Sequence, residues 1–179
     1  MMKTSMKVSL GGVVAALSLV LMFLTSLIPF GTYAFPTFAG ILLVLLVINL
    51  GYRWTFAVYF ITAILSFLLL SDKEAALYYT AFLGFYPIVK SLIERIPSIV
   101  LQYIVKFSLF NVCIIAAFFI GMTLLSIPKE SFTLFGVYLP WVFLILGNLF
   151  FLLYDLCVTR LVTLYFLKWH NKLNKNTKL

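Results

Sequence analysis

Asn111 and Asp155 are polar residues inside long apolar stretches of the sequence. Counted inward from the ends of their predicted helices, both lie at a similar depth of about 18–20 Å. Because amides and carboxylates are costly in hydrocarbon, we expect both to face the bundle interior and to hydrogen-bond to each other, directly or through water. Lys106 and Arg160 are placed to supply countercharge. The pair is either a polar tie between two helices or the floor of a binding site or proton relay.

The predicted outer third of the helices is rich in aromatic residues. The ones that we expect to line a substrate site are Tyr33, Tyr78, Tyr79 and Phe82. Asn148 shares the helix face of Asp155, seven residues away, and would line a cavity above it. Tyr86-Pro87 is expected to kink its helix and free a backbone carbonyl. An aromatic cup with few hydroxyls suits a small molecule, although aromatic residues are also common at membrane interfaces without any ligand.

Catalytic motifs are absent from the sequence, which contains no DDxxD, HExxH, GxSxG or Walker A pattern. Only five residues are acidic. The cysteines, Cys113 and Cys157, fall inside apolar runs without a CxxC spacing, and the single histidine lies in the basic tail. We therefore predict no enzyme activity, no metal site, no cofactor and no disulfide.

Two short charged patterns have structural explanations. Ser71-Asp72-Lys73-Glu74 has the spacing of a capping box, in which Ser71 caps the next helix and Glu74 reaches back. A charged outer gate is the alternative. Lys90 and Glu94 are four residues apart and predict a stabilising pair on a helix face near the cytoplasm.

The composition identifies a membrane protein, because 64% of the 179 residues are hydrophobic and 10% are charged. A soluble domain of this size cannot hide so much apolar surface, which excludes soluble enzymes, nucleic-acid-binding domains and disordered chains. A membrane-spanning helix needs about 20 apolar residues. We predict an all-α, six-transmembrane-helix bundle that forms a single domain over residues 1–179. The predicted spans are residues 8–28, 35–50, 54–70, 75–93, 98–125 and 139–167.

Basic residues predict the orientation. With six crossings, both termini share one side with the second and fourth connections. The basic residues on that side are Lys3, Lys7, Arg53, Lys90, Arg95, Lys168, Lys172, Lys175 and Lys178. Lys73 and Lys129 are on the other side. The positive-inside rule then places both termini in the cytoplasm, where the excess charge meets anionic lipid rather than nucleic acid.

The first predicted helix carries two overlapping pairs of small residues, each with a spacing of four. Gly11 pairs with Ala15, and Gly12 pairs with Ala16. Such a face lets another helix approach closely. The approaching helix belongs either to this bundle or to another subunit.

With its length, its spans and this first helix, the chain resembles the substrate-binding S components of energy-coupling-factor (ECF) transporters over nearly its whole length. The stretch 72–95 also looks like uncharacterised membrane proteins of this type from Gram-positive anaerobes. The resemblance implies a multi-pass protein of the bacterial cytoplasmic membrane. Its partners would be a transmembrane coupling subunit, two cytoplasmic ATPases and a small-molecule ligand held under loops 29–34, 71–74 and 127–138. The coupling subunit would meet Gly11, Gly12, Ala15 and Ala16, where glycines depart from the alanine pattern of the family.

The function implied by this resemblance is capture of a vitamin or other micronutrient from outside the cell for ATP-driven import. The chain would contribute recognition and no chemistry. The alternative is a six-span structural or morphogenetic membrane scaffold similar to the rod-shape protein MreD, which would also be small, basic-tailed and free of catalytic motifs.

Overall fold

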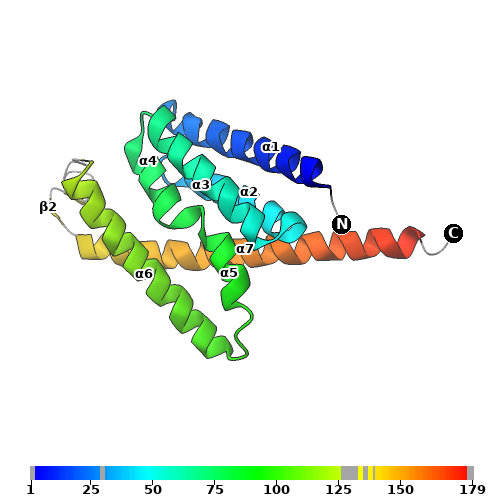
Figure 1. Cartoon of the computed structure of the whole chain (residues 1–179). Helices are drawn as coiled ribbons and strands as arrows, with labels where there is room; N and C mark the ends of the chain where they lie inside the picture. The colour runs from blue at the N-terminus through cyan, green and yellow to red at the C-terminus, as the bar shows by residue number, and fades with distance from the viewer. Residues whose placement is uncertain (1–2, 29–30, 126–132, 135–136, 139, 177–179) are drawn as a thin grey trace.

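The computed structural model describes residues 3–28, 31–125, 133–134, 137–138 and 140–176, which are almost entirely helical (Figure 1). In chain order the elements are α1 (Thr4–Phe23), the 3-10 helix η1 (Leu24–Ser26), α2 (Ala34–Leu50), α3 (Tyr52–Leu69), α4 (Lys73–Tyr78), the π-helix η3 (Tyr79–Leu83), α5 (Tyr86–Ile93), α6 (Ile99–Thr123), the strands β1 (Thr133–Leu134) and β2 (Val137–Tyr138), and α7 (Pro140–Asn176). The two-residue strands pair antiparallel, with Thr133 opposite Tyr138.

Five helical segments among the described residues are long and apolar enough to cross a membrane. They are Thr4–Ser26, Tyr52–Leu69, Lys73–Ile93, Ile99–Thr123 and Trp141–Lys168. The sixth predicted span corresponds to α2, which is apolar but has 17 residues. A straight crossing needs about 20. The helices overlap the predicted spans, and a count of six crossings remains a prediction.

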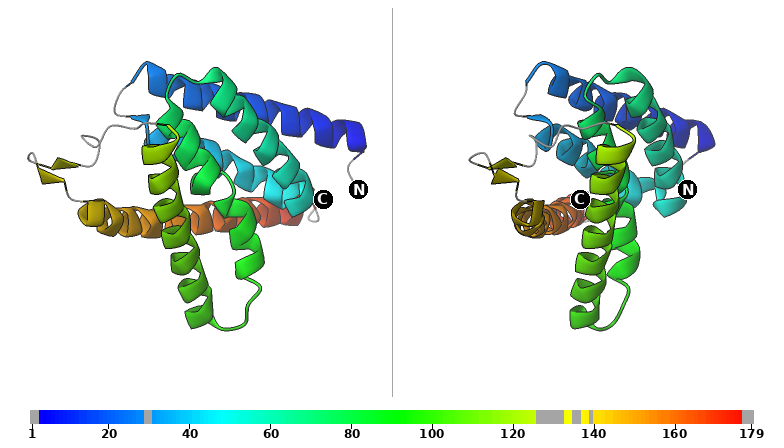
Figure 2. Two further views of the ribbon diagram at one scale, coloured as in Figure 1. Left: turned by 60° about the vertical axis from the view of Figure 1, so that its left-hand side comes forward. Right: turned by 90° about the vertical axis from the view of Figure 1, so that its left-hand side faces the viewer.

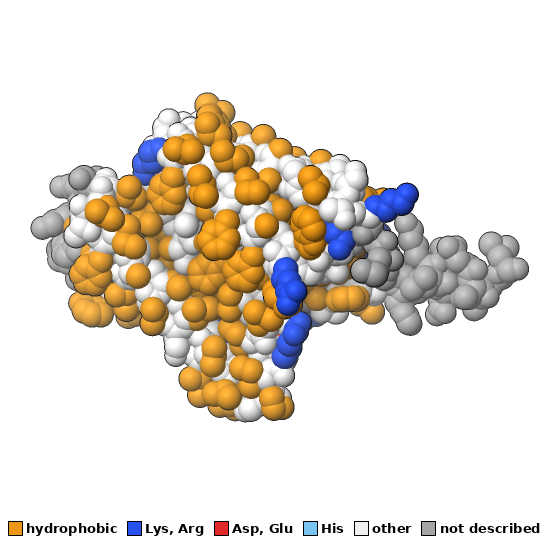
Figure 3. Space-filling view, viewed as in Figure 1, with side chains coloured by type: hydrophobic (Ala, Val, Ile, Leu, Met, Phe, Trp, Pro, Cys, Tyr) orange, Lys and Arg blue, Asp and Glu red, His pale blue; other side chains and the backbone are white. Residues whose placement is uncertain are grey.

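The exterior of the molecule is apolar. Figure 3 shows hydrophobic side chains spread over most of the visible face. Leu27, Leu68 and Leu124 are 75%, 71% and 77% exposed. Soluble monomers do not expose apolar surface on this scale. Together with the long apolar helices, this surface has the character of an all-α, multi-pass membrane protein.

The helix α2 is the centre of the packing and contacts α1, α3, α5 and α7. Its close approach to η3 and α7 depends on Gly40. A Cβ at this position would collide with the Leu83 carbonyl and lie 2.8 Å from the Tyr154 hydroxyl. Tyr154 donates a hydrogen bond of 2.9 Å to that same carbonyl. The absence of a side chain at Gly40 therefore leaves room for a buried bond that joins η3 to α7.

The chain turns from α2 into α3 at a single residue, Gly51. Its φ of 82° and ψ of 168° lie in a region of backbone space that is open essentially to glycine. Two antiparallel helices follow each other without a loop, which brings the start of α3 to the start of α1. The Lys7 ammonium lies 5.7 Å from the centre of the Trp54 ring there.

Asp72, and not Ser71, caps α4. The Asp72 carboxylate accepts a hydrogen bond of 3.0 Å from the Ala75 N–H. The predicted capping box is therefore wrong, because the helix begins one residue later than that pattern requires. Glu74 does not reach back and instead accepts hydrogen bonds from tyrosines of the site described below.

The segment from α4 to α5 is interrupted, as the Tyr86-Pro87 pair predicts. The interruption begins earlier than expected, at the π-helix η3, and Pro87 falls in the first turn of α5, where its missing N–H breaks no hydrogen bond. The Thr80 carbonyl accepts a hydrogen bond of 2.6 Å from the Tyr59 hydroxyl. The carbonyl that Pro87 would leave free is that of Leu83, four residues earlier, and it accepts the hydrogen bond from Tyr154 described above.

α1, α2, α3 and α7 run roughly along one direction, whereas α5 and the beginning of α6 project to one side and the rest of α6 crosses α7 (Figures 1 and 2). The beginning of α1 and the end of α7 lie at the same end of the molecule (Figure 1). α6 crosses α7 where the rings of Phe110 and Phe151 stack at 4.8 Å. This crossing divides the space between the two helices into two parts.

The two small-residue pairs of α1 face different ways. Gly11 is buried, and a Cβ there would lie 3.0 Å from Val58 of α3. Ala15 is half-buried on the same side. Gly12 and Ala16 are exposed, and a Cβ at Gly12 would meet nothing within 4 Å. One pair thus packs inside this chain, and the other is available to a neighbour.

Candidate functional site

A cavity of about 470 Å³ lies between α6 and α7 at the end of the molecule away from the termini. Clefts that hold small molecules commonly have this volume. The lining is apolar and strongly aromatic, and none of its described residues is charged. Its aromatic members are Tyr33, Tyr78, Phe82, Phe110, Phe118, Phe119, Trp141, Phe143 and Phe150. We call this space the aromatic cavity.

Three of the four predicted aromatic site residues line the aromatic cavity: Tyr33, Tyr78 and Phe82. Tyr79 lies outside it. Its side chain is fully buried on the other side of the helix, with its ring 6.0 Å from that of Tyr59. The neighbours Tyr78 and Tyr79 point to different faces because successive helical residues are about 100° apart.

Hydrogen bonds fix one wall of the aromatic cavity. Tyr33 and Tyr78 donate to the same oxygen of Glu74 at 3.1 and 3.2 Å, and Thr32 donates to Asp72 at 3.0 Å. Burial, together with the negative charge of Glu74, raises the pKa of the Tyr33 hydroxyl to about 12. The hydroxyl is therefore protonated at neutral pH and acts as a donor. These bonds hold the chain before α2 against the start of α4.

Two of the three loops expected to cover a ligand lie beside this wall, at residues 31–34 and 71–74. Residues 29–30 lie outside the described residues. So does the third loop, 127–138, except for the four strand residues.

Asn111 pairs with Asn148 and not with Asp155. The two amides exchange reciprocal hydrogen bonds of 3.0 Å across the crossing of α6 and α7. Each amide also donates a hydrogen bond of 2.8 Å to a carbonyl one turn back in its own helix. The predicted direct Asn111–Asp155 bond is wrong, because Asn111 lies at the level of Asn148, and seven helical residues separate Asn148 from Asp155 by about 10 Å along the α7 axis. With both N–H groups of each amide occupied, the pair is a tie between helices.

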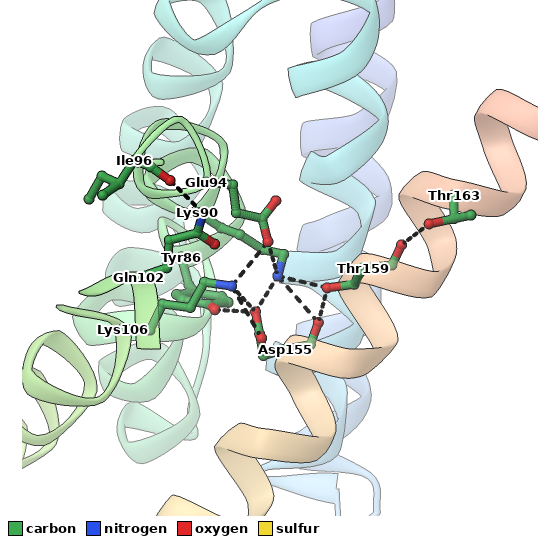
Figure 4. Close-up of polar contacts among 9 residues, drawn as sticks. All are labelled: Tyr86, Lys90, Glu94, Ile96, Gln102, Lys106, Asp155, Thr159 and Thr163. Carbon is green, nitrogen blue, oxygen red and sulfur yellow. Dashed lines mark hydrogen bonds and ion pairs between the residues drawn. The ribbon is translucent and has the colours of Figure 1, made fainter. Parts of the chain in front are cut away.

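Asp155 is the buried centre of a cluster of charged residues (Figure 4), and Glu94, with a side chain 40% exposed, is its outer member. Its carboxylate accepts from the Tyr86 hydroxyl and from the Lys90 ammonium, and it lies 3.2 Å from the Lys106 ammonium. Glu94 bridges both lysines, at 2.7 Å from Lys90 and 3.0 Å from Lys106. The side chains of Lys90 and Lys106 are 2% and 5% exposed. We call these five residues the charged cluster.

Two ammonium groups and two carboxylates make the charged cluster formally neutral. Neutrality and direct pairing are what allow ionised groups to remain inside an apolar bundle. Lys90 also donates a hydrogen bond of 2.8 Å to the Thr159 hydroxyl. The cluster therefore joins α5, α6 and α7 at one level of the molecule.

The sequence predicted Lys106 as a countercharge for Asp155, and the structure confirms that contact. It does not confirm Arg160, which is exposed and has no ion pair within the described residues. The predicted Lys90–Glu94 pair is present, but Lys90 is buried instead of lying on the surface. The overlooked signal is that Tyr86, Lys90 and Glu94 are each four apart and share one helix face.

An aromatic block separates the aromatic cavity from the charged cluster. The rings of Phe82 and Tyr86 stack at 4.8 Å, as do those of Phe110 and Phe151. The two pairs meet edge to face, with Phe82 5.1 Å from Phe110 and Tyr86 5.2 Å from Phe151. These four rings therefore lie between the aromatic cavity and the Asp155 carboxylate.

Comparison with protein-family models, with curated proteins and with solved structures finds no match for this chain. The coarse class of the protein therefore rests on its own fold and site. The chain is an all-α protein with at least five helices suited to a membrane, an aromatic cavity at one end and a charged cluster beneath it.

Proposed function

We propose that the chain is the substrate-binding subunit of an ATP-driven importer of the energy-coupling-factor type. The observation that carries this proposal is the aromatic cavity, which is large enough for a small molecule and whose described lining, apart from Tyr33, is on helices. It lies at the end of the molecule opposite the termini. With six crossings and both termini in the cytoplasm, that end faces the outside of the cell.

The substrate class follows from the lining of the aromatic cavity. A charged ligand would lose its hydration without meeting an opposite charge, which is strongly unfavourable. The hydroxyls of Tyr33 and Tyr78 are already engaged with Glu74. Stacking and edge contacts with the rings therefore supply most of the binding energy. These properties suit an uncharged, aromatic or largely apolar micronutrient.

The outer face of α1 is suited to contact with a partner subunit, which supports the importer proposal. Gly12 and Ala16 leave a shallow strip on a helix whose neighbouring Val13 and Leu17 are also exposed. A helix of a coupling subunit can approach such a strip closely. Gly11 and Ala15 belong to the contact with α3 and are not part of this proposed interface.

The test is purification of the full chain from its native membrane in a mild detergent, followed by identification of the small molecules and proteins that remain bound. Leu144→Trp places a large ring in the aromatic cavity, while Leu149→Trp is its control on an exposed part of the same helix. We expect one uncharged compound in the wild type and in Leu149→Trp. In Leu144→Trp its amount per mole of protein should fall at least tenfold, about 1.4 kcal/mol or more.

The protein readout of the same purification tests the importer assignment. A coupling subunit and paired ATPases should accompany the wild type, and the double variant Gly12→Leu/Ala16→Leu should lose them while keeping the compound. Association with cell-wall synthesis proteins instead would favour the scaffold alternative. A compound retained equally by both tryptophan variants would contradict the cavity as the binding site.

A further inference from the structure

A second cavity of about 380 Å³ lies between α2, α5 and α7, on the other side of the charged cluster from the aromatic cavity. We call it the inner cavity. On α7 its lining begins at Val158, whereas that of the aromatic cavity ends at Phe150, so about 12 Å of helix separates the two. The inner cavity is at the level where α2 ends and α3 begins, which is the end of the molecule that holds the termini.

One wall of the inner cavity is apolar. It consists of Val44, Val47, Ile48, Val158, Val162 and Phe166. Phe166 is 54% exposed, so this wall continues onto the apolar outer surface of α7. A hydrocarbon chain from the surrounding bilayer can therefore pack here without crossing a polar barrier.

The opposite wall is polar and carries one unbalanced positive charge. Lys90 and Glu94 line it, but both belong to the formally neutral charged cluster. Ser91 donates its hydroxyl hydrogen to the Ile88 carbonyl. Arg95 is exposed, and its guanidinium has no hydrogen bond or ion pair within the described residues.

A second arginine lies close to this wall. Arg53 donates a hydrogen bond of 3.3 Å to the hydroxyl of Tyr52, and Tyr52 is a lining residue of the inner cavity. Figure 3 shows several basic side chains in the half of the molecule that holds the start of α3 and α5, with no acidic side chain visible beside them. Arg95 in the lining and Arg53 next to it therefore place positive charge beside the inner cavity, while the Glu94 carboxylate is paired with Lys90 and Lys106.

We propose that the inner cavity binds one anionic phospholipid, with an acyl chain against the valine wall and the headgroup phosphate against Arg95. The membrane supplies this ligand, and the lining matches both of its parts: hydrocarbon on one side and an unpaired guanidinium on the other. An arginine near the membrane surface contributes about fivefold to the preference for an anionic headgroup. This site is independent of the proposed substrate in the aromatic cavity.

The test is native mass spectrometry of the purified full chain, titrated with phosphatidylglycerol, phosphatidylcholine of the same acyl chains, or inorganic phosphate. We expect the wild type to retain phosphatidylglycerol about fivefold more strongly than phosphatidylcholine. Arg95→Gln should remove that preference, while Arg160→Gln, at an exposed arginine away from the cavity, should keep it.

Two tryptophan variants test the acyl-chain wall. Val162→Trp fills the inner cavity and should lower retention of both lipids, whereas Leu164→Trp is on an exposed position outside the lining and should not. Equal effects of Arg95→Gln and Arg160→Gln would overturn the proposal, and the arginine pair decides it even if Val162→Trp does not fold. Displacement of phosphatidylglycerol by inorganic phosphate would also overturn it, because the site would then bind a free anion.

Discussion

At the scale of single residues, Asp155 shows how an ionised group is kept inside an apolar bundle. It receives two lysines and a tyrosine from two other helices, and Glu94 balances the second lysine. Each charge has a partner of opposite sign, so no ion is left to be solvated by hydrocarbon. The arrangement ties three helices together next to the aromatic block that supports the cavity.

Removing one member of the charged cluster should therefore destabilise the fold strongly. We expect Asp155→Leu to lower the free energy of unfolding by about 3–5 kcal/mol, because it leaves an uncompensated buried ammonium. The measurement is reversible unfolding of the purified chain in detergent micelles.

The double variant Lys90→Met/Asp155→Leu is the matched control for this loss. It removes one charge of each sign and leaves Lys106 paired with Glu94, so it should regain most of the stability. If the single and double variants are equally unstable, charge balance is not what holds these helices together.

At the scale of elements, local chain geometry decides where each helix begins and ends. Gly51 lets α2 and α3 follow each other without a loop, Asp72 caps α4, and Ser98 caps α6. Tyr78, the last residue of α4, and Phe82 of the π-helix η3 line the aromatic cavity, while Tyr79 packs into the opposite core. Such π-helical turns occur often at functional sites.

Gly51 provides a test of the direct turn between α2 and α3. Alanine at this φ of 82° and ψ of 168° should lower the free energy of unfolding by about 1–3 kcal/mol, since a Cβ disfavours that backbone conformation. Gly12→Ala is the control, because Gly12 has ordinary helical geometry and open space around it. Its stability should be unchanged or slightly raised, and an equal loss in both variants would show that the turn carries no strain.

At the scale of the whole molecule, the number of crossings decides which end faces outside. The beginning of α1 and the end of α7 lie at the same end of the structure, which fits an even number of crossings (Figure 1). α2 is the shortest of the predicted spans that form one continuous helix, but it packs against α1, α3, α5 and α7 and leaves few side chains, such as Phe38 and Leu45, exposed to lipid. A helix covered by neighbours can cross with fewer lipid-facing residues than an isolated one.

Cysteine labelling measures the crossings directly. In a variant with Cys113 and Cys157 replaced by serine, single cysteines at Lys3 and Lys168 should react with a membrane-impermeant maleimide only after the cells are permeabilised. A cysteine at Ala34, exposed at the other end of the molecule, should react in intact cells. Opposite accessibility of Lys3 and Lys168 would contradict six crossings and the proposed outward cavity.

Much of the fold could be predicted because hydropathy is a local property. Apolar runs of about 20 residues have few ways to satisfy their backbone in a bilayer other than as helices, and the predicted segments overlap the helices of the structure, although the segment 75–93 is divided into α4, η3 and α5. The aromatic residues Tyr33, Tyr78 and Phe82 could be selected from position near helix ends alone. The capping residue of α4 was missed because Ser71 and Asp72 are both good caps, and the choice between them depends on where the backbone enters the helix.

The membrane character of the protein, its helical segments and the need of Asp155 for partners can all be predicted from the residues, since each follows from the transfer of side chains between water and hydrocarbon. Which partners those are depends on how the helices pack. Asn111 meets Asn148, and Lys90 turns inward to Asp155, because the crossing of α6 and α7 sets the register between residues far apart in the chain. The aromatic and inner cavities depend on the same crossing, and no local pattern specifies the angle and depth at which two helices meet.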